Sequence, residues 1–250
     1  MTSSDQIPSP ALVTGASRGF GRAIASALHA AGAEVVAVAR DAERLASLRD
    51  ELGDRLTPVV ADVADPVAAG TLVDRYRPGT LVLNAGATPL LRPLHQLTWE
   101  AFSRNWEVDV RHAFHWVREA LLRPLPPGST VITMSSGAAL GGSPLSGGYA
   151  GAKATIRFVT GYAAAESARA DLGIRFISVL PKLTPSTELG LLAVAAYARR
   201  DGLDIGAYLE RSGPGLAPED VGKATLDLVA STAYGNGAYL LTPSGLSPLD

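Results

Sequence analysis

Short apolar runs alternate with longer segments of helical spacing along almost the whole chain. Continuous apolar runs are typical of strands that are buried on both faces, so we expect a strand in each of them. The runs are "ALVTGA" (11–16), "AEVVAVA" (33–39), "LTPVVADV" (56–63), "TLVLNAG" (80–86), "STVITMSS" (129–136) and "IRFISVLP" (174–181). The spacing predicts helices over 20–31, 41–52, 66–76, 98–122, 149–171 and 218–230.

This alternation predicts an α/β fold with a doubly wound parallel sheet and right-handed crossovers. A further run, "GAYLLT" (237–242), brings the expected sheet to about seven strands. We expect one domain over 11–250, preceded by a polar, proline-broken and disordered lead over 1–10. The segment 182–217 breaks the rhythm with two apolar helical patches, and we interpret it as a lid over a substrate.

Composition narrows the class of partner. The 250 residues carry a formal net charge of −2 and no dense Lys/Arg cluster, which argues against nucleic acid as a ligand. No apolar run reaches membrane-spanning length, and the first ten residues lack the layout of a signal peptide. The chain has no cysteine, which excludes disulfides and fits a reducing compartment. We therefore expect a cytoplasmic protein that binds a small molecule.

A glycine-rich turn joins the first strand to the first helix. "TGASRGFG" (14–21) places Gly15, Gly19 and Gly21 in the spacing G-x-x-x-G-x-G. Glycines allow a tight turn and the close approach of a pyrophosphate, and the free N–H groups at the start of a helix attract negative charge. The context predicts a dinucleotide site that includes Ser17, Arg18 and Phe20.

The end of the second strand bears on the choice of dinucleotide. An acidic residue there would bind the ribose hydroxyls of NAD, but the chain has Arg40 after Ala39. Guanidinium groups at Arg40 and Arg18 suit a 2′-phosphate, which favours NADP(H). The alternative is that both arginines are solvated surface charges.

"SSGAALGGSPLSGGYAGAK" (135–153) carries the candidate chemistry. Tyr149 and Lys153 stand at positions i and i+4 of a helix, so both project from one face. A neighbouring ammonium stabilises a phenolate and lowers the pKa of the phenol, which makes it a better acid–base group. Ser136 lies thirteen residues earlier at the end of a strand, where ligands collect in open parallel sheets.

Taken together, "TGASRGFG", "ADV" (61–63), "NAG" (84–86), Ser136, "YAGAK" (149–153) and Pro181 resemble the short-chain dehydrogenase/reductase family over nearly the whole chain. The resemblance implies a Rossmann-type fold and a nicotinamide cofactor. It implies that Tyr149 donates or accepts the proton, and that Lys153 lowers the pKa of Tyr149 and holds the nicotinamide ribose. Ser136 would hydrogen-bond the substrate oxygen.

The same resemblance implies further contacts. Asp62 and Val63 would contact adenine, and Asn84, Ala85 and Gly86 would line the adenosine side. Pro181 and Thr184 would complete the cofactor site. The glycine-rich stretch 137–148 would form a flexible rim of the substrate pocket. Helices 98–122 and 149–171 would pair across a two-fold axis into a homodimer or homotetramer.

Three positions depart from the family pattern. Asp109, in "NWEVDVRHAF", stands where the family has an asparagine that anchors a proton-relay water, and Asn105 lies one turn too early to replace it. Asp109 borders an apolar stripe, so we expect it not to be freely solvated; it is either an isostere that holds the same water or a group with a distinct chemical role. The usual Pro-Gly is Pro181-Lys182, and "LLTPSGLSPLD" replaces the usual Asp-Gly-Gly ending.

These residues lead to one preferred function and two alternatives. The preferred function is an NADPH-dependent oxidoreductase of the carbonyl reductase or alcohol dehydrogenase type, acting on a hydrophobic carbonyl substrate under the leucine-rich lid. The first alternative adapts the scaffold to enone or imine reduction, or to a redox-neutral dehydration or cyclisation. The second is a non-catalytic NADP-binding sensor or assembly subunit. The four histidines show no ligand spacing, so we expect no metal site.

Overall fold

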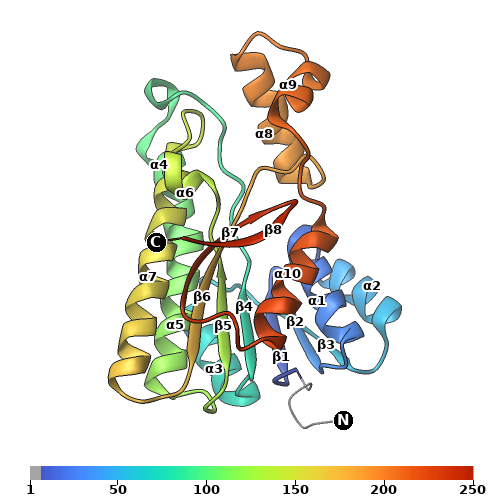
Figure 1. The fold of residues 1–250 in the computed structure, drawn as a ribbon, viewed down its shortest axis with the longest axis vertical. Helices are drawn as coiled ribbons and strands as arrows, with labels where there is room; N and C mark the ends of the chain where they lie inside the picture. The colour runs from blue at the N-terminus through green and yellow to red at the C-terminus, as the bar shows by residue number, and fades with distance from the viewer. Residues whose placement is uncertain (1–6, 250) are drawn as a thin grey trace.

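An eight-stranded sheet runs through the centre of the computed structural model, which describes residues 7–249 (Figure 1). The spatial order is β3-β2-β1-β4-β5-β6-β7-β8, with β8 antiparallel and the other strands parallel. The strands are β1 (Ala11–Thr14), β2 (Val35–Ala39), β3 (Leu56–Val60), β4 (Thr80–Leu83), β5 (Thr130–Met134), β6 (Arg175–Pro181), β7 (Gly237–Thr242) and β8 (Gly245–Leu249).

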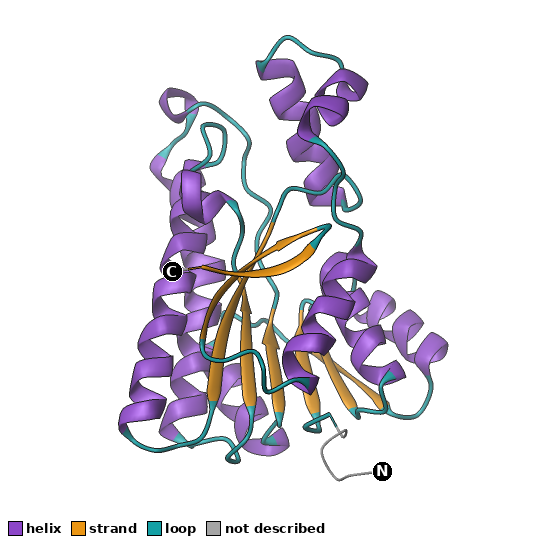
Figure 2. Ribbon diagram, viewed as in Figure 1, coloured by secondary structure: helices purple, strands orange, loops and turns teal. Residues whose placement is uncertain are grey.

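Helices cover both faces of the sheet (Figure 2). The pleat explains the two cores, because successive side chains of a strand point to opposite faces: Val13 joins the core under α1 and α10, and Leu12 joins the core under α3, α5 and α7. The helices are α1 (Gly19–Ala30), α2 (Ala42–Leu52), α3 (Pro66–Tyr76), α4 (Trp99–Asn105), α5 (Arg111–Leu122), α6 (Ala138–Gly141), α7 (Gly147–Arg169), α8 (Glu188–Arg200), α9 (Ile205–Ser212) and α10 (Pro218–Ala230).

The predicted fold class is confirmed, with one strand more than the apolar runs indicated. The added strand, β8, pairs with β7 in a hairpin that closes at Thr242 and Gly245. Gly245 has a φ of 113°, a conformation that L residues with side chains rarely adopt. The hairpin was missed because "GLSPL" is a short, mixed segment at the sheet edge rather than a buried apolar run.

The helix predicted over 98–122 is interrupted, which corrects the prediction. A π-helical turn, η2 (Trp106–Val110), separates α4 from α5. A π turn contains an extra residue, which rotates the helix surface on either side of it relative to a regular α-helix. The apolar stripe of this segment, which includes Trp99, Phe114 and Val117, therefore does not face the core along its length: Trp99 and Phe114 are exposed, whereas Val117 is buried.

The start of the described chain is ordered, so the expectation of a disordered lead over 1–10 is wrong for residues 7–10. Ile7 is buried in the core, and the Thr80 hydroxyl donates a hydrogen bond to the Pro8 carbonyl at 2.8 Å. Residues 1–6 lie outside the described residues.

The segment 182–217 forms a helical protrusion beyond the carboxyl ends of the strands, at the top of Figure 1. It contains α8 and α9, whose tyrosines Tyr197 and Tyr208 stack with ring centroids 6.5 Å apart. The Thr184 hydroxyl donates a hydrogen bond to the Leu216 carbonyl, which ties the two ends of the protrusion together. We call this segment the lid as a label; its role as a cover over a substrate stays a prediction.

Candidate active site

The candidate residues collect at the carboxyl edge of the sheet. From β1 the chain winds outward through β2 and β3, then returns to the other side of β1 as β4. Ligands of doubly wound sheets bind at such a reversal. The glycine turn, the "NAG" segment and Ser136 follow β1, β4 and β5 respectively, so the topology brings them to one edge.

The glycine turn forms a cradle that side chains would fill. Gly15 has a φ of 66°, and a Cβ atom there would lie 2.9 Å from the Ala85 Cα atom. A Cβ atom on Gly21 would collide with the Gly15 carbonyl. The first turn of α1 has no side-chain cap and no acidic residue, which leaves its N–H groups available to an anion. These features fit the pyrophosphate of a dinucleotide.

The "NAG" segment is bonded to this cradle. The Asn84 side-chain amide donates to the Thr14 carbonyl at 3.1 Å, and the Asn84 backbone N–H donates to the Thr14 hydroxyl at 2.9 Å. A Cβ atom on Gly86 would lie 2.9 Å from Asp109 Oδ2. Asn84 and Gly86 therefore let the β1 and β4 turns approach each other and Asp109.

The arginines predicted to hold a 2′-phosphate differ in their surroundings. Arg40 is exposed, and no ion pair of Arg40 is found within residues 7–249. Arg18 forms an ion pair with Glu188 at the start of α8. Arg44 also contacts Glu188, with 3.5 Å between Nη1 and Oε1. Glu188 of the lid thus places its carboxylate against Arg18 and Arg44, next to the glycine turn.

Other predicted cofactor residues lie around the same edge. Asp62 is exposed, and its carboxylate accepts a hydrogen bond from the Ala64 N–H at 3.0 Å. Val63 is buried, and its carbonyl accepts a hydrogen bond from the Trp116 indole at 2.9 Å. Ser17 is half-buried in the glycine turn, and Phe20 packs partly buried against the core.

The predicted nicotinamide side contains Pro181 and Thr184. The Pro181 carbonyl accepts a hydrogen bond from the Gly137 N–H at 2.9 Å, which joins the end of β6 to the turn after Ser136. Thr184 is buried, and its hydroxyl also accepts a hydrogen bond from the Ser186 N–H at 3.1 Å. Its hydroxyl proton is already used to hold Leu216.

Tyr149 and Lys153 lie on one face of α7, as their spacing predicts. The Lys153 ammonium lies 5.6 Å from the centre of the Tyr149 ring and donates to the Met134 carbonyl at 3.0 Å. Ser136 Oγ accepts a hydrogen bond from the Ala138 N–H at 3.2 Å, which leaves the Ser136 hydroxyl proton free to donate. Gly148 places α7 directly against α4, because a Cβ atom at Gly148 would collide with the Phe102 carbonyl.

Asp109 and Lys153 form a buried ion pair. Lys153 Nζ lies 3.3 Å from Asp109 Oδ2, and the two side chains are 7% and 0% exposed. Asp109 Oδ1 accepts a hydrogen bond from the Ala87 N–H at 2.7 Å. Burial alone would lower the pKa of Lys153, but Asp109 and Tyr149 outweigh it and raise that pKa above its usual value. Lys153 is therefore firmly cationic at neutral pH.

His112 is a buried group at this site to which the sequence assigned no role. Its Nδ1 lies 3.2 Å from the Ala85 carbonyl, and its Nε2 is buried without a hydrogen-bond partner. Burial, and next the charge of Lys153, lower the pKa of His112 to about 3. His112 is therefore neutral at physiological pH.

Sequence reasoning also missed Arg44 and Glu188. The sequence held a weak signal for Arg44, because Arg44 follows Asp41 by three residues, a spacing at which two helical side chains can pair. In the structure Arg44 Nε lies 3.3 Å from Asp41 Oδ2. Glu188 had no such signal, since nothing in the lid sequence indicates that it contacts the glycine turn.

Comparison with known proteins identifies the family. The family model for short chain dehydrogenase matches residues 9–191. Human L-xylulose reductase is 43% identical over 100 residues, which are 40% of this chain and 41% of that protein. Carbonyl reductase 2 of Sus scrofa, whose name specifies NADPH, is 37% identical over 124 residues, 48% of this chain and 50% of that protein. These alignments span about half the length of the two relatives or less.

Other matches extend over nearly the whole chain. L-rhamnose 1-dehydrogenase (NAD(P)(+)) of Sphingomonas sp. strain SKA58 is 31% identical over 247 residues, 94% of each protein. An oxidoreductase of the short chain dehydrogenase/reductase family from Burkholderia thailandensis has a solved structure that matches with a TM-score of 0.76 and 25% identity, covering 93% of this chain and 90% of that one. The chain belongs to the short-chain dehydrogenase family.

The described helices and acidic or histidine side chains give no sign of a membrane span or a metal site. None of the helices within residues 7–249 is long and apolar enough to cross a membrane. No group of three or more His, Cys, Asp or Glu side chains in that range is arranged to hold a metal ion.

Proposed function

We propose that the chain is an NADP(H)-dependent oxidoreductase that interconverts a carbonyl compound and its alcohol. The observation that carries this proposal is the buried Lys153 ammonium beside Tyr149, at the same sheet edge as the glycine cradle. A protein that only bound a dinucleotide would not need a cation held against a phenol. The names of the relatives, which include reductases and a dehydrogenase, support the same class of reaction.

In this proposal each residue has a defined task. Ser136 donates a hydrogen bond to the substrate carbonyl oxygen, and Tyr149 gives that oxygen its proton. Lys153 stabilises the negative charge that develops on the phenolic oxygen, and Asp109 fixes the position of Lys153. The nicotinamide, when bound, supplies or accepts the hydride. In the same proposal Lys153 also holds the nicotinamide ribose.

NADP(H) is the proposed cofactor because Arg18 and Arg44 lie around Glu188 at the edge of the glycine turn, and because the residue that follows β2 directly is Arg40 rather than an acidic residue. The glycine turn, Asp62, Val63, the "NAG" segment, Pro181 and Thr184 complete the proposed cofactor site. One relative is named for NADPH and another for NAD(P)+, so the family name alone does not select the phosphate.

The experiment that tests the function is an absorbance assay with purified protein. NADPH and NADH are each offered with a panel of aliphatic ketones, enones and imines. We expect ketone-dependent oxidation of NADPH in preference to NADH. Equal affinity for the two cofactors would refute the cofactor assignment. Tight NADPH binding without turnover of any panel member would favour a non-catalytic NADP-binding protein.

A second candidate function follows from the direct contact between Asp109 and Lys153. We propose that Asp109 stands in for the asparagine of the family and positions Lys153; the alternative is that Asp109 transfers protons and adapts the scaffold to other chemistry. The two differ in Asp109→Asn, which keeps the shape and the bond from Ala87. A positioning role predicts ketone turnover within about tenfold of wild type. A loss of about 10²–10⁴-fold, with NADPH affinity and folding unchanged, would favour proton transfer.

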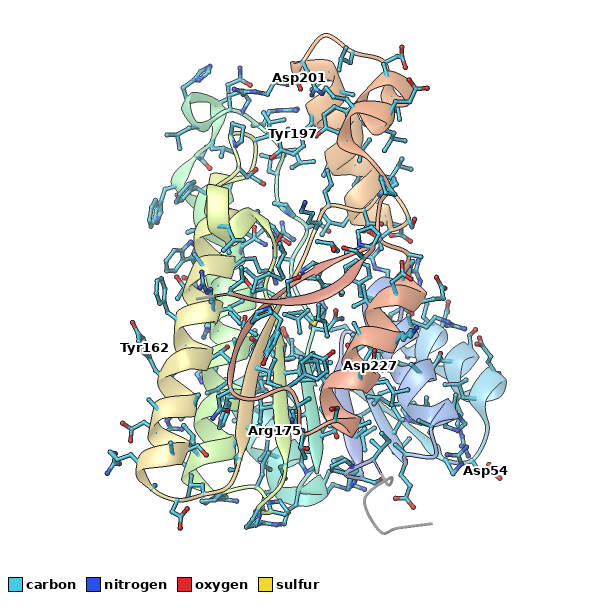
Figure 3. The ribbon with its side chains drawn as sticks, viewed as in Figure 1. Asp54, Tyr162, Arg175, Tyr197, Asp201 and Asp227 are labelled. Carbon is cyan, nitrogen blue, oxygen red and sulfur yellow. The ribbon has the colours of Figure 1, made fainter. Side chains whose placement is uncertain are left out.

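We also propose that the protein is a homo-oligomer through α4–α5 and α7. Large apolar side chains are exposed on these helices, including Phe114 at 50%, Phe158 at 59% and Tyr162 at 67%. Figure 3 shows Tyr162 projecting outward from α7. Clusters of this kind mark protein interfaces. Light scattering is expected to give a dimer or tetramer at micromolar concentration, and a monomer would refute the proposal.

A further inference from the structure

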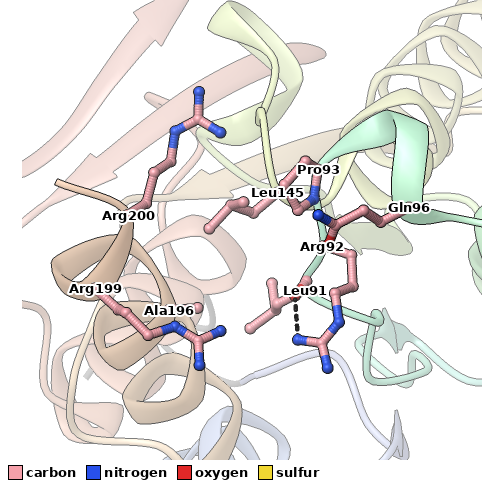
Figure 4. Close-up of a pocket in the computed structure, with 8 residues that line it drawn as sticks. All are labelled: Leu91, Arg92, Pro93, Gln96, Leu145, Ala196, Arg199 and Arg200. Atoms are coloured by element: carbon pink, nitrogen blue, oxygen red, sulfur yellow. Dashed lines mark hydrogen bonds between the residues drawn. The ribbon is translucent and has the colours of Figure 1, made fainter.

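A cavity lies between the lid and the loop that follows the "NAG" segment. Its volume is about 500 Å³. Figure 4 shows the lining: Arg92 and Leu91 come from the loop, Leu145 from the rim before α7, and Ala196, Arg199 and Arg200 from α8 of the lid. Arg92 and Arg199 extend towards each other from opposite sides, with Leu91 drawn between them.

The charge of this cavity is one-sided. Three arginines line it, and no aspartate or glutamate does so among the described residues. Several other surface arginines face carboxylates, as Arg22 faces Glu51 and Arg123 faces Asp74, whereas Arg40, like the cavity arginines, has no ion pair within residues 7–249. Within residues 7–249 no ion pair of Arg92, Arg199 or Arg200 is found. All three arginines are exposed, so water screens their mutual repulsion, but an anion bound in the cavity would meet several guanidinium groups and no competing carboxylate among the lining residues.

The helix dipole does not account for this arrangement. Arg199 and Arg200 occupy the last turn of α8, where cations are favourable. Arg92, however, lies in a loop, and within residues 7–249 its guanidinium makes one hydrogen bond, a long one of 3.4 Å to the Leu91 carbonyl. The helix dipole therefore does not explain why Arg92 lies opposite the lid arginines, and an anionic ligand would explain it.

Hydrogen bonds connect this cavity and the lid to the segment directly before α7, the helix that carries Tyr149. The Arg92 N–H donates to the Leu145 carbonyl at 2.9 Å. Ser143 hydrogen-bonds Tyr197 of the lid and lies 2.6 Å from the Ser146 hydroxyl, directly before α7. Tyr149 stands in the first turn of α7, four residues after Leu145. A molecule whose carbonyl lies at Tyr149 can therefore extend along the rim into the cavity.

We propose that the arginine cavity binds an anionic group, a carboxylate or a phosphate ester, at the end of the substrate distant from the reacting carbonyl. The reaction itself rests on the proposed function. The substrate class is thus an oxo acid or a ketose phosphate, whose apolar or neutral middle part contacts Leu91 and Leu145. Guanidinium forks suit both oxyanions.

Matched substrate pairs test this proposal. Oxo carboxylates with the ketone at increasing distance from the acid are compared with their methyl esters, and dihydroxyacetone phosphate is compared with dihydroxyacetone, each with NADPH. We expect the anion to have the lower KM in at least one pair; the pair that shows this distinguishes a carboxylate from a phosphate ester. Arg92→Gln and Arg199→Gln should each raise that KM by about three- to tenfold and leave the KM of the neutral partner unchanged.

The control variant is Arg75→Gln, which removes one exposed cation from α3, away from the lid. It should leave every KM unchanged. If neutral ketones are reduced and no anion is preferred, or if Arg75→Gln has the same effect as Arg92→Gln, the proposal is wrong.

A binding measurement separates this proposal from the proposed function. With NADP+ saturating, hexanoate and inorganic phosphate are titrated by calorimetry against wild type and Arg92→Gln/Arg199→Gln. Binding that is lost in the double variant supports the anion site even where no carbonyl is reduced. Absence of binding to wild type, together with absence of anion preference in the assay, refutes it.

Discussion

Two ion pairs at the carboxyl edge of the sheet differ in almost every physical respect. At the nucleotide side, Arg18 and Glu188 join the glycine turn to the lid, with side chains 53% and 61% exposed. At the chemical side, Lys153 and Asp109 join α7 to the π turn, with side chains 7% and 0% exposed. Water screens the first pair, whereas the second lies in a medium where charges interact strongly.

This difference indicates which of the two ion pairs a ligand can replace. An exposed pair contributes little to stability, so Glu188 can yield its place on Arg18 to a phosphate at small cost. A buried pair cannot be opened without leaving an uncompensated charge. The nucleotide side is thus suited to binding and release, and the chemical side to holding one ammonium in a constant position.

The buried pair predicts the largest effect. Lys153→Met should lower the free energy of unfolding by about 3–5 kcal/mol, because it leaves the Asp109 carboxylate buried without its cation. It should also abolish measurable turnover. Urea unfolding gives the first quantity, and the NADPH assay gives the second.

A double variant shows whether the charge is the cause. Asp109→Asn/Lys153→Met removes both charges, so it should be more stable than Lys153→Met while remaining inactive. If the double variant is less stable than Lys153→Met, the loss comes from packing and the interpretation of the pair is wrong.

His112 adds a third case to the comparison. It is a buried titratable group near Lys153, and unlike Lys153 it stays neutral at physiological pH. Its folded-state pKa is about 3 and its ordinary value is 6.5, so between these values the unfolded chain binds the extra proton. Stability should fall as the pH drops from 6.5 towards 3, by about 2–4 kcal/mol at pH 4. His112→Gln should make that decline shallower in urea unfolding at several pH values.

The matched control is His95→Gln, in the exposed loop after the "NAG" segment. It should leave the acid decline as in wild type. An unchanged decline in His112→Gln would show that other groups cause it.

On the exposed side, Arg40 predicts a smaller effect. Arg40→Asp should weaken NADPH binding by roughly 1–3 kcal/mol, the range for hydrogen bonds between charged groups, and improve NADH binding relative to it. Fluorescence titration of both cofactors measures the ratio. An NADPH to NADH preference equal to that of wild type would exclude Arg40 from the phosphate site.

We expect the smallest effect for a change at Glu188, and here NADPH affinity should rise rather than fall. Glu188→Gln frees Arg18 and Arg44 from a competing carboxylate, so NADPH affinity should rise by about two- to fivefold, and more at low salt. Glu166→Gln, which removes an exposed carboxylate paired with Arg169 on α7, is the control and should leave the affinity unchanged. Weaker NADPH binding in Glu188→Gln would mean that Glu188 supports the cofactor rather than competing with it.

The features that could be predicted from the sequence are those that depend on residues close together along the chain. Buried runs and helical spacing indicated the doubly wound sheet, because periodicity is a local consequence of which faces are buried. Gly15 and Gly21 indicated the cradle, since only a residue without a side chain fits there. The spacing of Tyr149 and Lys153 placed both on one face of α7, because four residues make about one helical turn.

The contacts between side chains far apart in the sequence became visible only in the tertiary structure. The π turn at Trp106–Val110 aims Asp109 at Lys153, and the helical spacing of that segment gave no sign of it. Glu188 reaches Arg18 across 170 positions of sequence, and the lid brings Arg199 to the cavity of Arg92. Such contacts depend on the packing of whole elements, and the burial that makes Asp109 and His112 unlike ordinary surface residues arises from the same packing.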